Sequence, residues 1–100
     1  MKINGKEVGF IYTIGAFCDY SDYVVKNPEV STSTANLHKI EIMSREYAKL
    51  HEEAEIITVD ELRGLMIYEL QDILEAVKKA EEEGTVRKVE TEPGKKTKKA

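Results

Sequence analysis

The first twelve residues have the pattern of a β-hairpin. Asn4 and Gly5 are residue types that accept the two positive φ angles of a type I′ turn. After the turn, apolar side chains recur at every second position, at Val8, Phe10 and Tyr12. A two-stranded ribbon alone is only marginally stable in water, so we expect one face of this hairpin to pack against helices.

From residue 13 onward the apolar spacing changes to that of an α-helix. Thr13 is suited to cap the start of this helix, because its hydroxyl can accept a hydrogen bond from a backbone N–H of the first turn. The helix should end at Asn27, because Pro28 pushes the residue before it out of the α region. One side of the helix, which we expect to be buried, consists of Ile14, Phe17, Cys18, Ser21, Val24 and Val25.

A second helical pattern follows a polar run at residues 31–34, which can supply the cap. The pattern continues to about Glu55, where we expect the helix to end. One side of this helix should be buried, because its apolar positions repeat over several turns. Its expected buried stripe is Leu37, Ile40, Met43, Tyr47, Leu50 and Ala54.

A third helical stretch starts at Thr58, which forms the spacing of a capping box with Glu61. It should end at Gly84. Gly64 leaves two alternatives open, one continuous helix or a short helix followed by a longer one, because an interior glycine costs only about 1 kcal/mol relative to alanine. The expected buried stripe is Val59, Leu62, Met66, Leu70, Ile73, Leu74, Val77 and Ala80.

The end of the chain has a different composition. Residues 85–100 offer two valines and otherwise mainly charged residues, glycine, proline and threonine, too little apolar area to offset the entropy of ordering. The sequence therefore predicts an α+β, mainly helical fold, in which an N-terminal hairpin precedes three or four helices. Residues 1–84 should form one small domain, and residues 85–100 a disordered basic tail.

Charge divides the chain in the same way. Residues 1–83 carry 17 acidic side chains against 9 Lys and Arg, whereas residues 84–100 carry 6 Lys and Arg against 2 acidic side chains. An acidic body repels phosphate backbones, so we expect no specific nucleic-acid partner. No apolar run approaches the roughly 20 residues that span a bilayer, which predicts no membrane partner and a cytoplasmic location.

The side chains that could carry chemistry do not form a catalytic or metal-binding pattern. His38 and His51 lie 13 positions apart and would point away from each other on one helix, so they cannot bind one metal ion together. His38 falls opposite the apolar stripe and should be a solvated surface residue. Cys18 has no histidine near it in sequence and should be a small buried hydrophobe. The glutamate clusters lack the alternating ligands of a calcium loop. We therefore expect no enzymatic activity, no cofactor and no metal site.

Three large side chains do not belong to the expected buried stripes. On ideal helices, Tyr23, Ile42 and Tyr68 each point away from the apolar side of their helix. Single exposed apolar residues are common on any protein surface. Alternatively, the three belong to a surface that binds a protein partner, since tyrosines contribute contact area at little cost in conformational entropy.

The order of these segments resembles the small tail assembly chaperones of siphophages. The resemblance is carried by INGKEVGFIYTIGA at the start, by ITVDEL, by MIYELQDILEAVKKAEEEGT and by a lysine-rich end. It implies a protein that coats the tape measure protein in the host cytoplasm and keeps its long apolar helices soluble until tail tube subunits replace it. The family has no catalytic residues, and whether this chain forms a homo-oligomer is left open.

A second function is compatible with the charge of the chain. The acidic body could occupy the basic groove of a nucleic-acid-binding protein and act as its regulator or inhibitor. Measuring binding at different salt concentrations would distinguish the two functions. Binding between opposite charges weakens as ionic strength rises, whereas binding to apolar helices persists.

Overall fold

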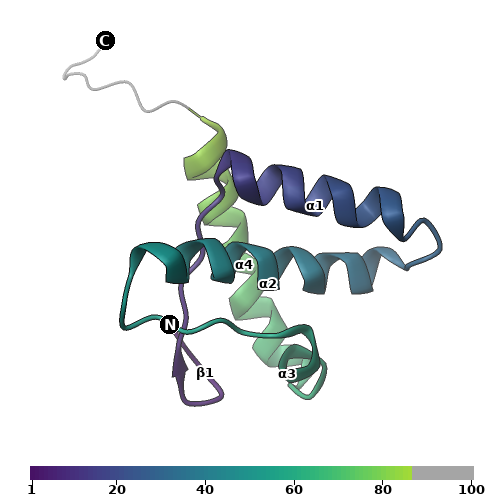
Figure 1. Ribbon diagram of the computed structural model, residues 1–100. Coiled ribbons are helices and arrows are strands. Elements are labelled where there is room, and N and C mark those ends of the chain that lie inside the picture. Colours follow the sequence, from purple (N-terminus) through teal and green to yellow (C-terminus); the bar gives the residue numbers. More distant parts are fainter. Residues whose placement is uncertain (87–100) are drawn as a thin grey trace, which may run out of the picture.

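The computed structural model describes residues 1–86, which form a short hairpin followed by four helices (Figure 1). The hairpin strands are β1 (Lys2–Ile3) and β2 (Lys6–Glu7). The helices are α1 (Ile14–Lys26), α2 (Thr32–Leu50), α3 (Val59–Arg63) and α4 (Ile67–Thr85). The predicted α+β, mainly helical class is therefore confirmed, in its version with four helices.

The helices are arranged around α2. In Figure 1, α1 and α2 lie side by side and run in opposite directions, while α4 passes behind α2 and the hairpin lies near the end of α2. The helix α4 continues to Thr85, one residue past the predicted end at Gly84. The rest of the predicted tail, residues 87–100, lies outside the described residues.

The hairpin turn has the predicted geometry. Asn4 and Gly5 have φ angles of 53° and 78°, and the strands pair antiparallel with Ile3 opposite Lys6. The strands are shorter than predicted, because the chain leaves the hairpin after Val8 and runs towards α2. Phe10 and Tyr12, predicted as strand positions, instead pack against the core outside the sheet.

The core lies between α2, α4, the hairpin and the segment before α3. Two apolar residues of α2, Ile40 and Met43, are almost completely buried at its centre. Leu50 and Met66, which were predicted to be buried, are exposed, because Leu50 is the last residue of α2 and Met66 precedes α4. The buried apolar residues are Ile3, Val8, Ala16, Ile40, Ile42, Met43, Ile57, Leu62, Ile73, Val77 and Ala80.

The helix α2 ends at Leu50, before the predicted end near Glu55. The following segment makes backbone hydrogen bonds to other parts of the protein instead of continuing the helix. The N–H of Glu55 donates to the carbonyl of Glu7 (2.8 Å), and the N–H of Ile57 donates to the hydroxyl of Ser44 (3.1 Å). Tertiary hydrogen bonds therefore outweigh the local helical tendency of this segment.

The third predicted helix is divided into α3 and α4. The capping box at its start is present, with the N–H of Glu61 donating to the hydroxyl of Thr58 (3.2 Å) and the N–H of Thr58 donating to the carboxylate of Glu61 (3.1 Å). Gly64 follows α3, and Met66 has the extended backbone of a residue that begins a new helix. The Glu69 carboxylate accepts a hydrogen bond from the Met66 N–H (3.0 Å) and stabilises that start.

Candidate protein-binding surface

The most apolar side of α1 faces away from the protein. Ile14 is 83% exposed, Phe17 is 56% exposed and Val25 is 77% exposed. This finding corrects the prediction that this side of the helix is buried. We call this surface the α1 stripe; it consists of Ile14, Phe17, Cys18, Ser21, Val24 and Val25.

A different side of α1 makes the contact with the core. Ala16 is its only buried residue, and its small side chain allows α1 and α2 to approach closely. Tyr20 is half-buried and packs against the core, with the ammonium group of Lys39 4.9 Å from its ring centre. Tyr23 stacks on the ring of His38 of α2, with ring centres 3.9 Å apart. Tyr20 and Tyr23 therefore make the contact with the rest of the protein, whereas the sequence predicted this contact for the more apolar side of α1.

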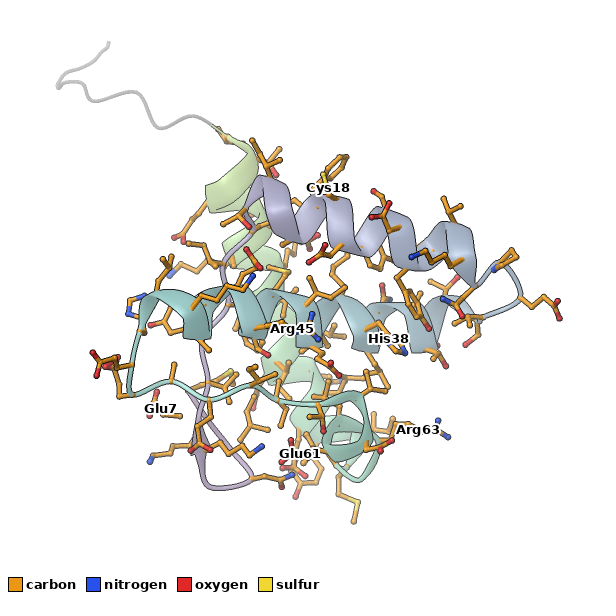
Figure 2. All side chains as sticks on the ribbon, in the orientation of Figure 1. Glu7, Cys18, His38, Arg45, Glu61 and Arg63 are labelled. Carbon is orange, nitrogen blue, oxygen red and sulfur yellow. The ribbon has the colours of Figure 1, made fainter. Side chains whose placement is uncertain are left out.

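Cys18 lies within the α1 stripe and is exposed. Figure 2 shows its side chain on the side of α1 that points away from α2. The expectation that Cys18 is a buried hydrophobe is therefore wrong, for the same reason that the stripe as a whole was misplaced. Because it is the single cysteine of the sequence, its thiol is a ready chemical probe of this surface.

Of the three large residues predicted to be exposed, the structure places one on the surface. Tyr68 is 71% exposed, as predicted, whereas Tyr23 is half-buried by its stacking on His38. Ile42 is only 7% exposed, which contradicts the prediction. The physical reason is that α2 contacts both α1 and α3, so that more than one of its sides is covered. The three residues do not form one surface patch.

Tyr68 belongs to a second exposed group at the start of α4. Met66, Ile67 and Tyr68 are consecutive residues, and each is more than half exposed. We call this group the α4 corner. It is smaller than the α1 stripe, and consecutive positions on a helix point in directions about 100° apart, so the three side chains do not form one face.

A polar groove of about 470 Å³ lies between α1 and α2, beside the α1 stripe. His38, expected to be solvated, is half-buried in this groove by its contact with Tyr23. Arg45 of the groove is held by the carboxylate of Glu41 at 2.7 Å. The residues lining the groove are Asp19, Asp22, Tyr23, Lys26, Asn27, His38, Glu41, Ile42 and Arg45.

Two carboxyl groups with lowered pKa values, those of Glu46 and Glu61, connect different elements of the fold through hydrogen bonds. The hydrogen bond from Lys49 (2.7 Å), followed by that from Thr13 (2.9 Å), lowers the pKa of Glu46. The hydrogen bond from Lys6 (2.8 Å), followed by that from a backbone N–H at the start of α3, lowers the pKa of Glu61. Glu46 thereby links α2 to the start of α1, and Glu61 links α3 to the hairpin.

Two further kinds of site are absent from residues 1–86. Within this range, no three His, Cys, Asp or Glu side chains lie close enough together to hold a metal ion. None of the helices formed by these residues has both the length and the apolar character to cross a membrane. The surface feature that stands out is therefore the α1 stripe.

Comparisons of the chain with protein-family models, with curated protein sequences and with solved structures give no match.

Proposed function

We propose that this protein is a non-enzymatic assembly chaperone that binds an apolar helix of a partner protein through the α1 stripe. The observation that carries this proposal is the direction of the stripe, since the most apolar side of a well-capped helix faces away from the core. Contiguous exposed apolar surface of this kind is typical of binding sites. An amphipathic helix of a partner can pack against such a face through regularly spaced apolar side chains.

The stripe is presented by a helix that is fixed at both ends. At its start, the Thr13 hydroxyl accepts a hydrogen bond from the Ala16 N–H (3.1 Å) and donates one to the Glu46 carboxylate (2.9 Å). At its end, the Asn27 side chain donates a hydrogen bond to the Tyr23 carbonyl (2.8 Å). Because α1 is already ordered, binding through it does not require the folding of a new helix.

The resemblance to siphophage tail assembly chaperones supports the tape measure protein as the partner. Its long apolar helices would be covered in the host cytoplasm until tail tube subunits replace the chaperone. The α1 stripe consists of side chains from a single 13-residue helix, fewer than the roughly 20–30 residues that each partner contributes to a stable interface. Individual contacts would therefore be weak and replaceable, and many copies along one long chain would hold the complex together.

Co-expression with a tape measure protein tests this proposal. We expect this chaperone to raise the soluble yield of the tape measure protein several-fold, because it covers apolar surface that otherwise aggregates. The double variant Ile14→Ser/Val25→Ser should lose most of this effect. Its melting temperature should stay within about 3 °C of the parent, since neither side chain is buried.

Two control variants and a salt series make the result specific. Leu50→Ser removes an exposed apolar residue outside the stripe and should leave the soluble yield unchanged. Tyr68→Ser measures the contribution of the α4 corner. If the double variant folds and solubilises the partner as well as the parent does, the α1 stripe is not the binding surface. If the complex instead dissociates as salt is raised, binding is electrostatic and the acidic-regulator function replaces the chaperone.

A further inference from the structure

The polar groove between α1 and α2 contains two carboxylates that the described part of the chain leaves unpaired. Asp19 and Asp22 line this groove, and neither has an ion-pair partner among residues 1–86. Glu41, which also lines the groove, is already paired with Arg45 at 2.7 Å. Lys26 is the one other lysine or arginine among the lining residues. The groove can therefore accept basic groups from another part of the chain.

A basic segment of the same chain begins close to this groove. Gly84 of α4 packs against Tyr12, just before α1, so closely that a Cβ at position 84 would overlap the Tyr12 carbonyl oxygen. In Figure 1, the end of α4 accordingly lies beside the start of α1. Residues 87–100, which follow, carry six Lys and Arg against two Asp and Glu. The basic end of the chain therefore continues from a point next to α1.

We infer that the carboxylates of Asp19 and Asp22 bind the lysines near the end of the chain and thereby hold residues 87–100 against the groove. We call these the terminal lysines; they are Lys95, Lys96, Lys98 and Lys99. The first of them is nine positions after Val86, a separation that can span up to about 30 Å. From Ile14, at the start of α1, to Asp22 is only about 12 Å along the helix axis. The terminal lysines can therefore reach both carboxylates.

The walls of the groove suit a lysine side chain. The stacked rings of Tyr23 and His38, with centres 3.9 Å apart, line the groove together with Ile42. The apolar stem of a lysine can pack along such rings while its ammonium group stays in water beside a carboxylate. This binding requires neither regular structure nor a buried apolar side chain in residues 87–100, which agrees with the composition of that segment.

The attachment is reversible, because each exposed ion pair is weak by itself. It forms nonetheless, since lysines tethered to the same chain have an effective concentration on the order of millimolar at the groove. The bound segment borders the α1 stripe and neutralises the carboxylates beside it. It therefore sets the charge next to the surface to which we assign partner binding, although the attachment itself does not depend on that function.

A nitroxide spin label on Cys18 tests the inference in the purified full chain, with no partner protein present. Cys18 is the single cysteine, is exposed, and precedes Asp19 on α1. At about 0.05 M NaCl, the amide NMR signals of residues 95–99 should lose most of their intensity compared with the reduced label. At about 0.5 M NaCl they should recover, because salt screens the ion pairs.

Two double variants separate the groove from the general charge of the protein. Asp19→Asn/Asp22→Asn should restore the signals of residues 95–99 at low salt to their high-salt intensity. The control Glu52→Gln/Glu75→Gln removes the same charge at two exposed positions outside the groove and should keep the signals weak. All four positions are exposed, so the melting temperatures should stay within about 3 °C of the parent.

The reverse experiment changes the lysines and observes the groove. Replacing the four terminal lysines by glutamine should shift the amide signals of Asp19, Asp22 and Tyr23 at low salt. The control Lys78→Gln/Lys79→Gln, on α4, should leave these signals in place.

Three outcomes would overturn the inference. The first is equal broadening of residues 95–99 in the parent and in Asp19→Asn/Asp22→Asn. The second is an equal loss of broadening in the Glu52→Gln/Glu75→Gln control, which would mean that the segment responds to the total charge of the protein and not to the groove. The third is broadening that is the same at both salt concentrations. None of these outcomes bears on whether the α1 stripe binds a partner.

Discussion

A single hydroxyl group, that of Ser44, connects α2 to the segment that precedes α3. Ser44 is completely buried, and it is the one buried polar residue in the described part of the chain. Its hydroxyl donates to the Glu41 carbonyl (2.8 Å) and accepts from the Ile57 N–H (3.1 Å). A buried hydroxyl with both partners costs little, whereas a buried N–H without a partner costs the full penalty of its desolvation.

We therefore expect Ser44→Ala to destabilise the protein by about 1–3 kcal/mol, because the variant leaves the Ile57 N–H buried without an acceptor. Urea denaturation followed by circular dichroism measures this loss. Ser33→Ala, at an exposed position of α2, serves as the matched control and should change the free energy of unfolding by less than about 0.5 kcal/mol. Equal effects in the two variants would mean that the buried hydrogen bond contributes nothing.

The lowered pKa of Glu61 makes stability depend on pH. A carboxyl group whose pKa is lower in the folded state stabilises the fold above its unfolded pKa, and this stabilisation is lost as pH falls through the folded value. The melting temperature of the parent should therefore fall from about pH 5 downward. Glu61→Gln cannot carry the charge that binds Lys6, so its melting temperature should be lower at pH 7 and fall less on acidification. An unchanged acid profile relative to the parent, or the same change in the exposed control Glu75→Gln, would contradict this role.

At the scale of the helix, the sequence predicted where α1 begins and ends but not the direction in which it faces. The cap at Thr13 and the stop at Asn27 are local signals, and both are confirmed. Which side of a helix is buried depends on the elements against which the helix packs. Tyr20 and Tyr23 provide that contact with their rings, because a tyrosine can pack against a core while its hydroxyl end reaches the surface.

The direction of α1 can be tested by comparing its two sides. Tyr20→Ala should cost about 2 kcal/mol or more, since it removes a ring that packs against the core. Val25→Ala should change the free energy of unfolding by less than about 0.5 kcal/mol, because its side chain is exposed and alanine is a good helix former. Thermal and urea denaturation of the two variants give the comparison. The reverse order of effects would mean that the stripe is buried after all.

The remaining helices show which element-scale signals can be read from a sequence. The capping box at Thr58 predicted the start of α3, and the apolar repeat at Ile73 and Val77 predicted buried positions of α4, because both signals are local or periodic. Leu74, which was assigned to the same buried stripe, is exposed. The predicted end of α2 was wrong, since the segment after Leu50 is held by tertiary hydrogen bonds, one of them to the carbonyl of Glu7, more than forty residues earlier.

At the scale of the whole molecule, the fold class could be predicted and the location of the exposed apolar surface could not. The residues that specify a hairpin turn or a helix cap lie close together in the sequence, so the α+β class with an N-terminal hairpin could be predicted from them. The burial of Ile42 depends on two other helices, α1 and α3, whose positions no single stretch specifies. The prediction that the α1 stripe is buried was wrong, because its exposure depends on α4 lying behind α2 rather than over α1.

The hydrogen bond between Lys6 and the Ile56 carbonyl (3.2 Å) joins positions 50 residues apart and constrains the order of folding. The ribosome releases the hairpin long before Ile57, Ile73 and Val77, which cover Ile3 and Val8 in the core. An unfinished chain therefore exposes its core residues together with the α1 stripe. The core residues and the exposed α1 stripe therefore become distinct surfaces only once the segment that forms α4 can pack behind α2.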